Sequence, residues 1–271
     1  MLDGYFAEDP EGLVPRSHAR GPWSEDMIHG RLFAALAARE VERRHLEGGL
    51  HIARVTADLF RATPMVPLTL RASRVRDGRR VRLVDVDVVA DGRPAARVSV
   101  LLAAAQGAPP GRVWGLGSWG LLPPVGLEPP EAGRAEAAGY PQLHFESAGF
   151  GDTSEPVRAW LRDRWPLVDG EELTPAQRAV LASDLANPVS NWGDRGLHYI
   201  NADITLEMVR APQGEWIGLE VLDHLDSDGI AIGSCRVHDE LGPLGQSNVV
   251  GMVYGSPMQP VAPPSASESG T

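Results

Sequence analysis

The sequence predicts an α+β fold in which one unit, a helix followed by long antiparallel strands, occurs twice. Stretches with helical spacing open at Ser24 and at Thr174, which lie 150 residues apart. After each stretch comes an Arg-Ala pair, at Arg61 and at Arg210, followed by strand-like segments. Self-similarity at a fixed offset, with a helix and then strands in each copy, indicates a duplicated α+β unit.

The chain is long enough for one large domain or two domains of ordinary size. It has 271 residues, of which 43% are hydrophobic, and this supports a substantial core. We predict an N-terminal unit over residues 1–105 and a C-terminal unit over 142–257. The Pro- and Gly-rich stretch 106–141 reads as a linker between them, and 258–271 reads as a disordered tail.

Both predicted helices carry start signals. Ser24 is followed by acidic residues, and Thr174 is followed by Pro175 at the first helical position, so both residues are expected to be N-caps. The pair Asn187-Pro188 is expected to end the second helix. In the first helix the apolar positions recur at roughly helical spacing, at Met27, Leu32, Leu36 and Val41.

The predicted strands alternate and are separated by tight turns. In "VRLVDVDVVADG" the residues Val84, Val86 and Val88 fall on one side, and Asp85 and Asp87 fall on the other. Two-residue hairpin signals occur at Asp77-Gly78, Asp91-Gly92 and Asp228-Gly229. A helix wrapped by an antiparallel sheet, present twice in one chain, is the double hot-dog arrangement.

Composition excludes several classes of function. The net charge of −11 argues against a general nucleic-acid binder, and no run of about 18 apolar residues could cross a membrane. With Cys235 as the single cysteine there is no intramolecular disulfide, and the start of the chain lacks the layout of a secretory signal. We therefore expect a cytoplasmic protein. The histidines show no metal-ligand spacing, so neither a metal nor a cofactor is expected.

Two segments resemble a known family. They are "RGPWSEDMIHGRLFAALAAR" and "YINADITLEMVRAPQGEWIGLEVLDHLDSDGIAIGSCRVHDELGPLGQS". Both resemble bacterial acyl-CoA thioesterase-like proteins with the double hot-dog fold, the thioesterase II group and its actinobacterial relatives. The resemblance covers most of the chain from about Gly21 to Tyr254, and the string around "NADIT" and "RAPQGEW" is its most specific part.

The resemblance implies a hydrolytic site in the second unit. In the family an aspartate on the helix, a Ser or Thr at the start of the next strand and a Gln from a later strand hold a water against the thioester carbonyl. Here Asp184 takes the aspartate position and Asn201 stands where the Ser or Thr falls. The glutamine position falls near Val249, and Gln246 or Asn248 could serve after a short register shift.

The first unit is expected to contribute an oxyanion or substrate-binding site. The resemblance places His29 and Gly30 where backbone N–H groups at the start of a helix polarise a carbonyl oxygen. Each candidate also has a purely structural interpretation. Asp184 could bond backbone groups at a helix end, Asn201 could satisfy a loop, and Gln246 could be a surface polar residue.

Three functions remain open from the sequence. The first is hydrolysis of acyl-CoA thioesters by an activated water, and the runner-up is a non-catalytic acyl-thioester-binding protein. A hot-dog hydratase is disfavoured because Ser190 occupies the position of that family's catalytic histidine. The expected ligand is acyl-CoA or a related acyl thioester, of a chain length that the sequence does not define. A homo-oligomer is expected because exposed sheet edges of such folds often pair.

Overall fold

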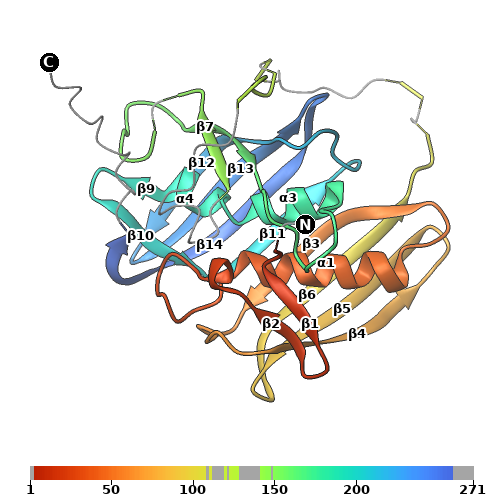
Figure 1. Ribbon diagram of the computed structural model, residues 1–271. Coiled ribbons are helices and arrows are strands. Elements are labelled where there is room, and N and C mark those ends of the chain that lie inside the picture. The colour runs from red at the N-terminus through yellow and green to blue at the C-terminus, as the bar shows by residue number, and fades with distance from the viewer. Residues whose placement is uncertain are drawn as a thin grey trace, which may run out of the picture.

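A computed structural model gives the arrangement of the chain. It describes residues 3–107, 110–111, 119–120, 122–127, 141–147 and 149–258. Most of the predicted linker 106–141, and the predicted tail beyond residue 258, lie outside the described residues. Within the described part, a 14-stranded sheet curves around the helices, which lie on one of its faces (Figure 1). No helix in this part is long and apolar enough to span a membrane.

Two units of the same topology form the body of this sheet. The first unit comprises α1 (Arg31–His45), β3 (Leu50–Leu59), β4 (Leu68–Asp77), β5 (Val81–Ala90) and β6 (Arg93–Ala104). The second comprises α3 (Pro175–Ser183), α4 (Ala186–Asn191), β11 (Asp203–Met208), β12 (Ile217–Ser227), β13 (Ile230–Asp239) and β14 (Gly242–Met258). Their strand orders, β4-β5-β6-β3 and β12-β13-β14-β11, correspond strand for strand, which confirms the predicted duplication.

Shorter elements extend the sheet at both ends. They are β1 (Phe6–Asp9), β2 (Gly12–Pro15), the 3-10 helix η1 (Ser17–Ala19), β7 (Gln142–Phe145), β8 (Arg158–Arg162), β9 (Trp192–Gly193) and β10 (Gly196–Asn201). The hairpin β1-β2 adds to the edge at β4, and the pair β7-β8 adds to the edge at β12. Strand β10 pairs with the second half of β14.

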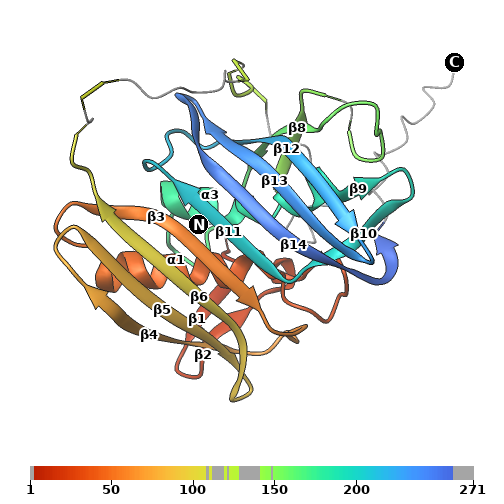
Figure 2. The same cartoon turned by 180° about the vertical axis from the view of Figure 1, so that it is seen from behind.

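The two units meet at the antiparallel pair β3–β11. Thr56 lies opposite Thr205 in this pair, and their hydroxyl oxygens are 3.4 Å apart. These two threonines are separated by 149 residues, close to the offset between the predicted helix starts. Figure 2 shows the result from behind, one continuous sheet running from β4 through β3 and β11 to β12.

The strand pattern of the first unit is as predicted. Val84, Val86 and Val88 are fully buried beneath the helix, while Asp85 and Asp87 point to the opposite face. The turns at Asp91 and Asp228 have positive φ angles of 51° and 50°, as two-residue hairpins require. The alternation therefore fixes which face of the sheet receives α1.

The predicted start of the first helix is wrong. Helix α1 begins at Arg31, seven residues after Ser24. Ser24 instead forms a turn in which its carbonyl accepts from the Met27 amide, and Met27 and Ile28 make β-bridges to Pro64 and Arg20. These bridges hold the segment extended, so His29 and Gly30 lie just before the helix rather than within it.

The second helix starts as predicted and ends differently. Thr174 caps α3 through a capping box with Gln177, and Pro175 is the first helical residue. Asn187-Pro188 does not stop the chain from being helical, because α4 runs through both residues. Pro188 lies in the first turn of α4, where a proline N atom has no helical hydrogen bond to lose. The break falls earlier, at Asp184 and Leu185.

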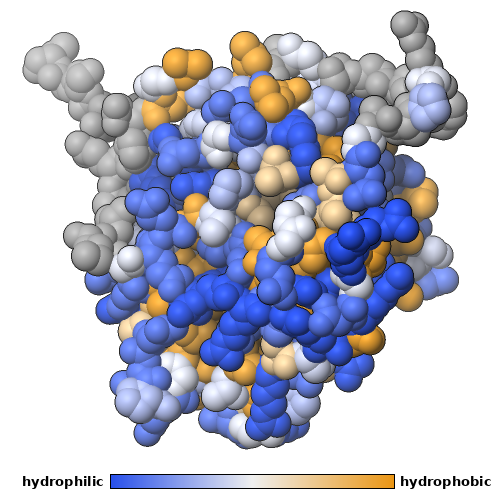
Figure 3. Space-filling model, turned by 90° about the vertical axis from the view of Figure 1, so that its right-hand side faces the viewer, coloured by the Kyte–Doolittle hydropathy of each residue, from blue (hydrophilic) through white to orange (hydrophobic). Residues whose placement is uncertain are grey.

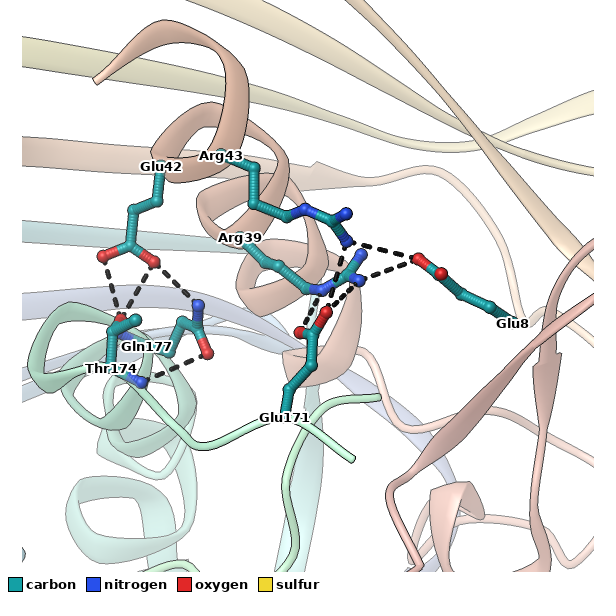
Figure 4. A network of polar contacts seen from close by, with 7 residues as sticks. All are labelled: Glu8, Arg39, Glu42, Arg43, Glu171, Thr174 and Gln177. Atoms are coloured by element: carbon teal, nitrogen blue, oxygen red, sulfur yellow. Dashed lines mark hydrogen bonds and ion pairs between the residues drawn. The ribbon is translucent and has the colours of Figure 1, made fainter. Parts of the chain in front are cut away.

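Helices α1 and α3 lie side by side and run in opposite directions. At one end Glu42 of α1 accepts hydrogen bonds from Thr174 and Gln177 at the start of α3 (Figure 4). At the other end His29, just before α1, meets Asp184, just after α3. This antiparallel packing brings the start of one unit's helix to the end of the other's.

Candidate active site

Asp184 is a buried carboxylate at the break between α3 and α4. Only 4% of the residue is exposed. Its Oδ1 accepts a short hydrogen bond from Nδ2 of Asn201, and its Oδ2 lies 3.5 Å from Nε2 of His29. The carboxylate thus contacts two side chains that come from different units. None of the described contacts of this carboxylate is a hydrogen bond to a backbone group at the helix end.

Asn201 reaches the carboxylate from the end of β10. It pairs with Gly251 of β14 across the sheet, and the next residue donates its amide to the Val250 carbonyl. The sheet therefore fixes the backbone from which the Asn201 amide extends. With Nδ2 donating to Asp184, the side-chain oxygen is the acceptor end of the same amide.

His29 and Gly30 approach from the first unit. The His29 amide donates to the Ala19 carbonyl, and the Ile28 amide donates to Thr63, so both sides of this segment are fixed. Gly30 is the N-cap of α1. A Cβ at this position would lie 2.9 Å from Cδ1 of Leu59, so a glycine lets the helix start pack closely on β3.

Their surroundings shift the pKa values of Asp184 and His29 in opposite directions. Burial raises the pKa of Asp184 to about 6, although the hydrogen bond from Asn201 and the charge of Arg31 act to lower it. Burial and the Arg31 charge hold the pKa of His29 well below its ordinary value. At neutral pH the site therefore holds an ionised carboxylate beside a neutral imidazole.

Gln246 is not brought to the other candidates. It is exposed on the outer face of β14, between Glu207 and Arg236 of the neighbouring strands. The inward positions on this strand are Ser247 and Val249, both buried. Alternation along a strand places Gln246 opposite to them.

Asn248 shares the outer face with Gln246 and accepts a hydrogen bond from Ser234. On the inner face, the Ser247 hydroxyl donates to the Ser183 carbonyl at 2.8 Å, directly before Asp184. The polar group that β14 sends toward the helix break is thus a serine, which the sequence reasoning did not single out.

A second polar cluster close to the site was also missed. Arg31 is fully buried and donates to Asp163 at 3.0 Å and to the Tyr5 hydroxyl at 2.8 Å. The signal in the sequence was an arginine directly after His29-Gly30, within an otherwise apolar stretch. Its partners come from distant segments, and no local pattern marks them. Among the described residues, no group of three or more His, Cys, Asp and Glu side chains could hold a metal ion.

Both units match models of a known protein family. Residues 19–103 match a family model described as the acyl-CoA thioesterase N-terminal domain, and residues 120–253 match one described as the acyl-CoA thioesterase C-terminal domain. No curated protein matches the sequence.

Solved structures agree with this fold. The TesB protein of Mycobacterium avium subspecies paratuberculosis is 13% identical with a TM-score of 0.67, and the match covers 90% of this chain and 92% of that one. The acyl-CoA thioesterase II TesB2 of Mycobacterium marinum is 16% identical with a TM-score of 0.59, over 83% and 90%. A hot-dog protein of unknown function from Alicyclobacillus acidocaldarius is 12% identical with a TM-score of 0.68, over 89% and 91%.

At these identities the structural likeness concerns the fold, whereas the two family models bear on the sequence itself. Together those models span both repeated units, and each falls on the unit whose position in the chain it describes. The chain belongs to the acyl-CoA thioesterase family, with the double hot-dog fold.

Proposed function

We propose that this protein hydrolyses acyl-CoA thioesters by means of a water molecule that Asp184 activates. The observation that carries the proposal is the buried carboxylate of Asp184, held by Asn201 at the junction of the two units. A pKa of about 6 leaves it ionised at neutral pH and makes it a stronger base than an exposed aspartate. Family membership supports an acyl-CoA thioester as the substrate class.

The proposed reaction needs one proton acceptor that later returns the proton. Asp184 takes a proton from water while the water oxygen attacks the thioester carbonyl carbon, which gives a tetrahedral intermediate. The C–S bond then breaks, the carboxylic acid leaves, and the proton on Asp184 passes to the coenzyme A sulfur. The carboxylate is thereby regenerated, and no other reactant is consumed.

The remaining residues have separate roles in this proposal. Because Asn201 donates to Oδ1, it fixes the carboxylate and leaves Oδ2 on the side of His29. A neutral His29 and the amide of Gly30 at the start of α1 would be donors to the oxygen that becomes negative in the intermediate. The reaction would then use one element from each unit.

The alternative is a protein that binds an acyl thioester without cleaving it. Two observations favour it. Gln246 faces outward, and the inward positions of the same strand hold Ser247 and Val249, so this strand brings no glutamine to Asp184. Asn201 also stands where the resemblance to the family places a Ser or Thr, so an amide takes the place of that hydroxyl beside Asp184.

The test is thiol release from a panel of acyl-CoA substrates of short to long chain length. It compares the wild type with Asp184→Asn, and with Asp87→Asn as a control on the outer face of the first unit. We expect turnover on part of the panel and a fall of about 10²- to 10⁴-fold in Asp184→Asn alone. Turnover that is insensitive to Asp184→Asn would overturn the proposed role. Absence of turnover, with thermal stabilisation by an acyl-CoA, would establish the binding alternative.

A further inference from the structure

Arg31 forms a buried ion pair next to the proposed active site. Its guanidinium donates to both Asp163 and the Tyr5 hydroxyl, and Tyr5 in turn donates to Asp163 at 2.8 Å. The side chain of Arg31 is 0% exposed and that of Asp163 is 3% exposed. The guanidinium, the carboxylate and the hydroxyl are therefore bonded to one another in the interior, as a buried charge pair requires.

This cluster joins three segments at the helix start that carries His29. Arg31 is the first residue of α1, Asp163 directly follows β8 in the second unit, and Tyr5 directly precedes β1. His29 lies two residues before Arg31, and the Leu32 amide donates to the His29 carbonyl. Any movement of the first turn of α1 would therefore change the 3.5 Å separation of His29 and Asp184.

We propose that Arg31 is a positioning residue of the Asp184 site, which it serves by fixing His29 against Asp184 and by placing one buried positive charge beside them. The inference rests on the proposed function. Asp163 and Tyr5 hold the guanidinium in place, so its charge remains at the site while the carboxylate gains and loses a proton.

The charge of Arg31 acts on both ionisable groups of the site in a definite direction. It opposes the effect of burial on Asp184 and adds to the effect of burial on His29. The groups that act on Asp184 are His29 before α1, Arg31 in α1 and Asn201 at the end of β10, and the neutral Ser247 on β14 bonds to the neighbouring Ser183 carbonyl. Arg31 is the permanent cation among them, because its guanidinium stays protonated.

The chain offers a matched control in Arg39. This residue lies on the same helix two turns later, is also nearly buried, and pairs with Glu171 and Glu8 (Figure 4). Glu171 belongs to the loop that also carries Asp163, so both arginines tie α1 to the same part of the second unit. Arg39 lies toward the far end of α1 from His29, and the arginine whose charge acts on the pKa of Asp184 is Arg31.

The experiment measures kcat/KM against pH for the wild type, Arg31→Met, Asp163→Asn and Arg39→Met. Loss of the Arg31 charge raises the pKa of Asp184, so the acidic limb of the profile should move to higher pH and the rate at pH 6 should fall roughly fivefold or more. Asp163→Asn leaves the Arg31 charge less compensated, so its limb should move to lower pH. Arg39→Met should lose stability and keep the wild-type limb.

A second readout separates failure of this inference from failure of the proposed function. The carboxyl signal of Asp184 is followed by ¹³C NMR through a pH titration of the same proteins, without substrate. Opposite shifts in Arg31→Met and Asp163→Asn would support the inference even if no acyl-CoA is hydrolysed. Identical titration of Asp184 in the wild type, Asp163→Asn and Arg39→Met would overturn it, and this comparison does not depend on the folding of Arg31→Met.

Discussion

Burial of Asp184 has a consequence for stability that does not depend on any reaction. The pKa of this carboxyl is about 6 in the folded protein against 3.8 for the unperturbed group. Because the folded state holds the proton more tightly, ionisation destabilises it, and the penalty grows as pH rises from about 4 to above 6. Natural selection for stability alone would not favour a carboxylate here.

Asp184→Asn should therefore stabilise the protein at neutral and alkaline pH. The neutral amide removes an ionisation penalty of about 3 kcal/mol above pH 7, and the gain should shrink toward zero near pH 4. Urea unfolding of the wild type and the variant at pH 8 and pH 4.5 measures the difference. A gain of equal size at both pH values would show that the charge of Asp184 is not its source.

Asn201 and Gln246 should differ sharply in their effect on hydrolysis. Asn201→Ala removes the donor that fixes Asp184, and we expect a loss of about tenfold or more in kcat/KM. Gln246→Ala changes an exposed side chain on the opposite face and should stay within about twofold of the wild type. The panel substrate with the highest turnover serves for both. A large loss in Gln246→Ala would mean that the outer face of β14 takes part.

The sequence predicted the candidate site only in part, for physical reasons. Asp184 was identifiable because a charged residue in an apolar helical stretch needs a partner. Gln246 was predicted to face Asp184 but lies on the outer face. Side chains on a strand alternate between faces, and the register of β14 cannot be predicted from the residues around Gln246 alone. Tyr5 and Asp163 were missed because the hydrogen bonds that join them to Arg31 and to each other span between 26 and 158 residues of the chain, and no local pattern marks such contacts.

At the scale of elements, the repeated arginines Arg61 and Arg210 brace equivalent hairpins. Arg61 donates to the backbone carbonyls of Ala90 and Pro94 at the turn between β5 and β6. Arg210 makes a bidentate contact with the carboxylate of Asp239 at the turn between β13 and β14. The Arg-Ala pair that revealed the duplication therefore has a structural task in each unit.

The two arginines predict unequal losses of stability. Arg210→Ala would leave the buried Asp239 carboxylate with backbone amides as its remaining described partners, and we expect a loss of about 3 kcal/mol. Arg61→Ala removes hydrogen bonds to partly exposed carbonyls and should cost about 1 kcal/mol. Urea unfolding at pH 7 compares them. Equal losses would show that the buried charge of Asp239 adds nothing.

Helix boundaries show where local signals are sufficient. The prediction that Thr174 is an N-cap was correct because the cap, Pro175 and Gln177 all act within one turn. Ser24 also carries the signals of a helix start, but the bridges of Met27 to Pro64 and of Ile28 to Arg20 hold its segment extended. Such bridges depend on segments that meet only in the folded chain, so the start of α1 could not be predicted from its own residues.

At the scale of the whole molecule, the duplicated units form one body with one core. Buried residues of both units belong to a single hydrophobic cluster, and β3 pairs with β11 along five residue pairs. Polar residues cover much of one side of this body (Figure 3). The proposed site lies where the units meet, because His29 comes from the first and Asp184 from the second.

Neither unit should therefore be active by itself. A fragment of residues 1–107 and a fragment of residues 141–271, expressed together, are expected to associate through β3 and β11 and to hydrolyse acyl-CoA. Each fragment alone should be inactive. The associated pair should lose its activity when the second fragment carries Asp184→Asn. Full activity of the second fragment alone would contradict a site shared between the units.

The pH dependence of kcat/KM tests the central claim, that the buried carboxylate of Asp184 is the base that activates water. It is measured between pH 4.5 and pH 9 for the wild type and for Asp184→Asn, with the acyl-CoA that turns over fastest. The wild type should lose activity on the acidic side with a midpoint near the pKa of about 6 for Asp184, and the variant should show a low rate without that limb. The same limb in both proteins would contradict the claim and assign the base to another group.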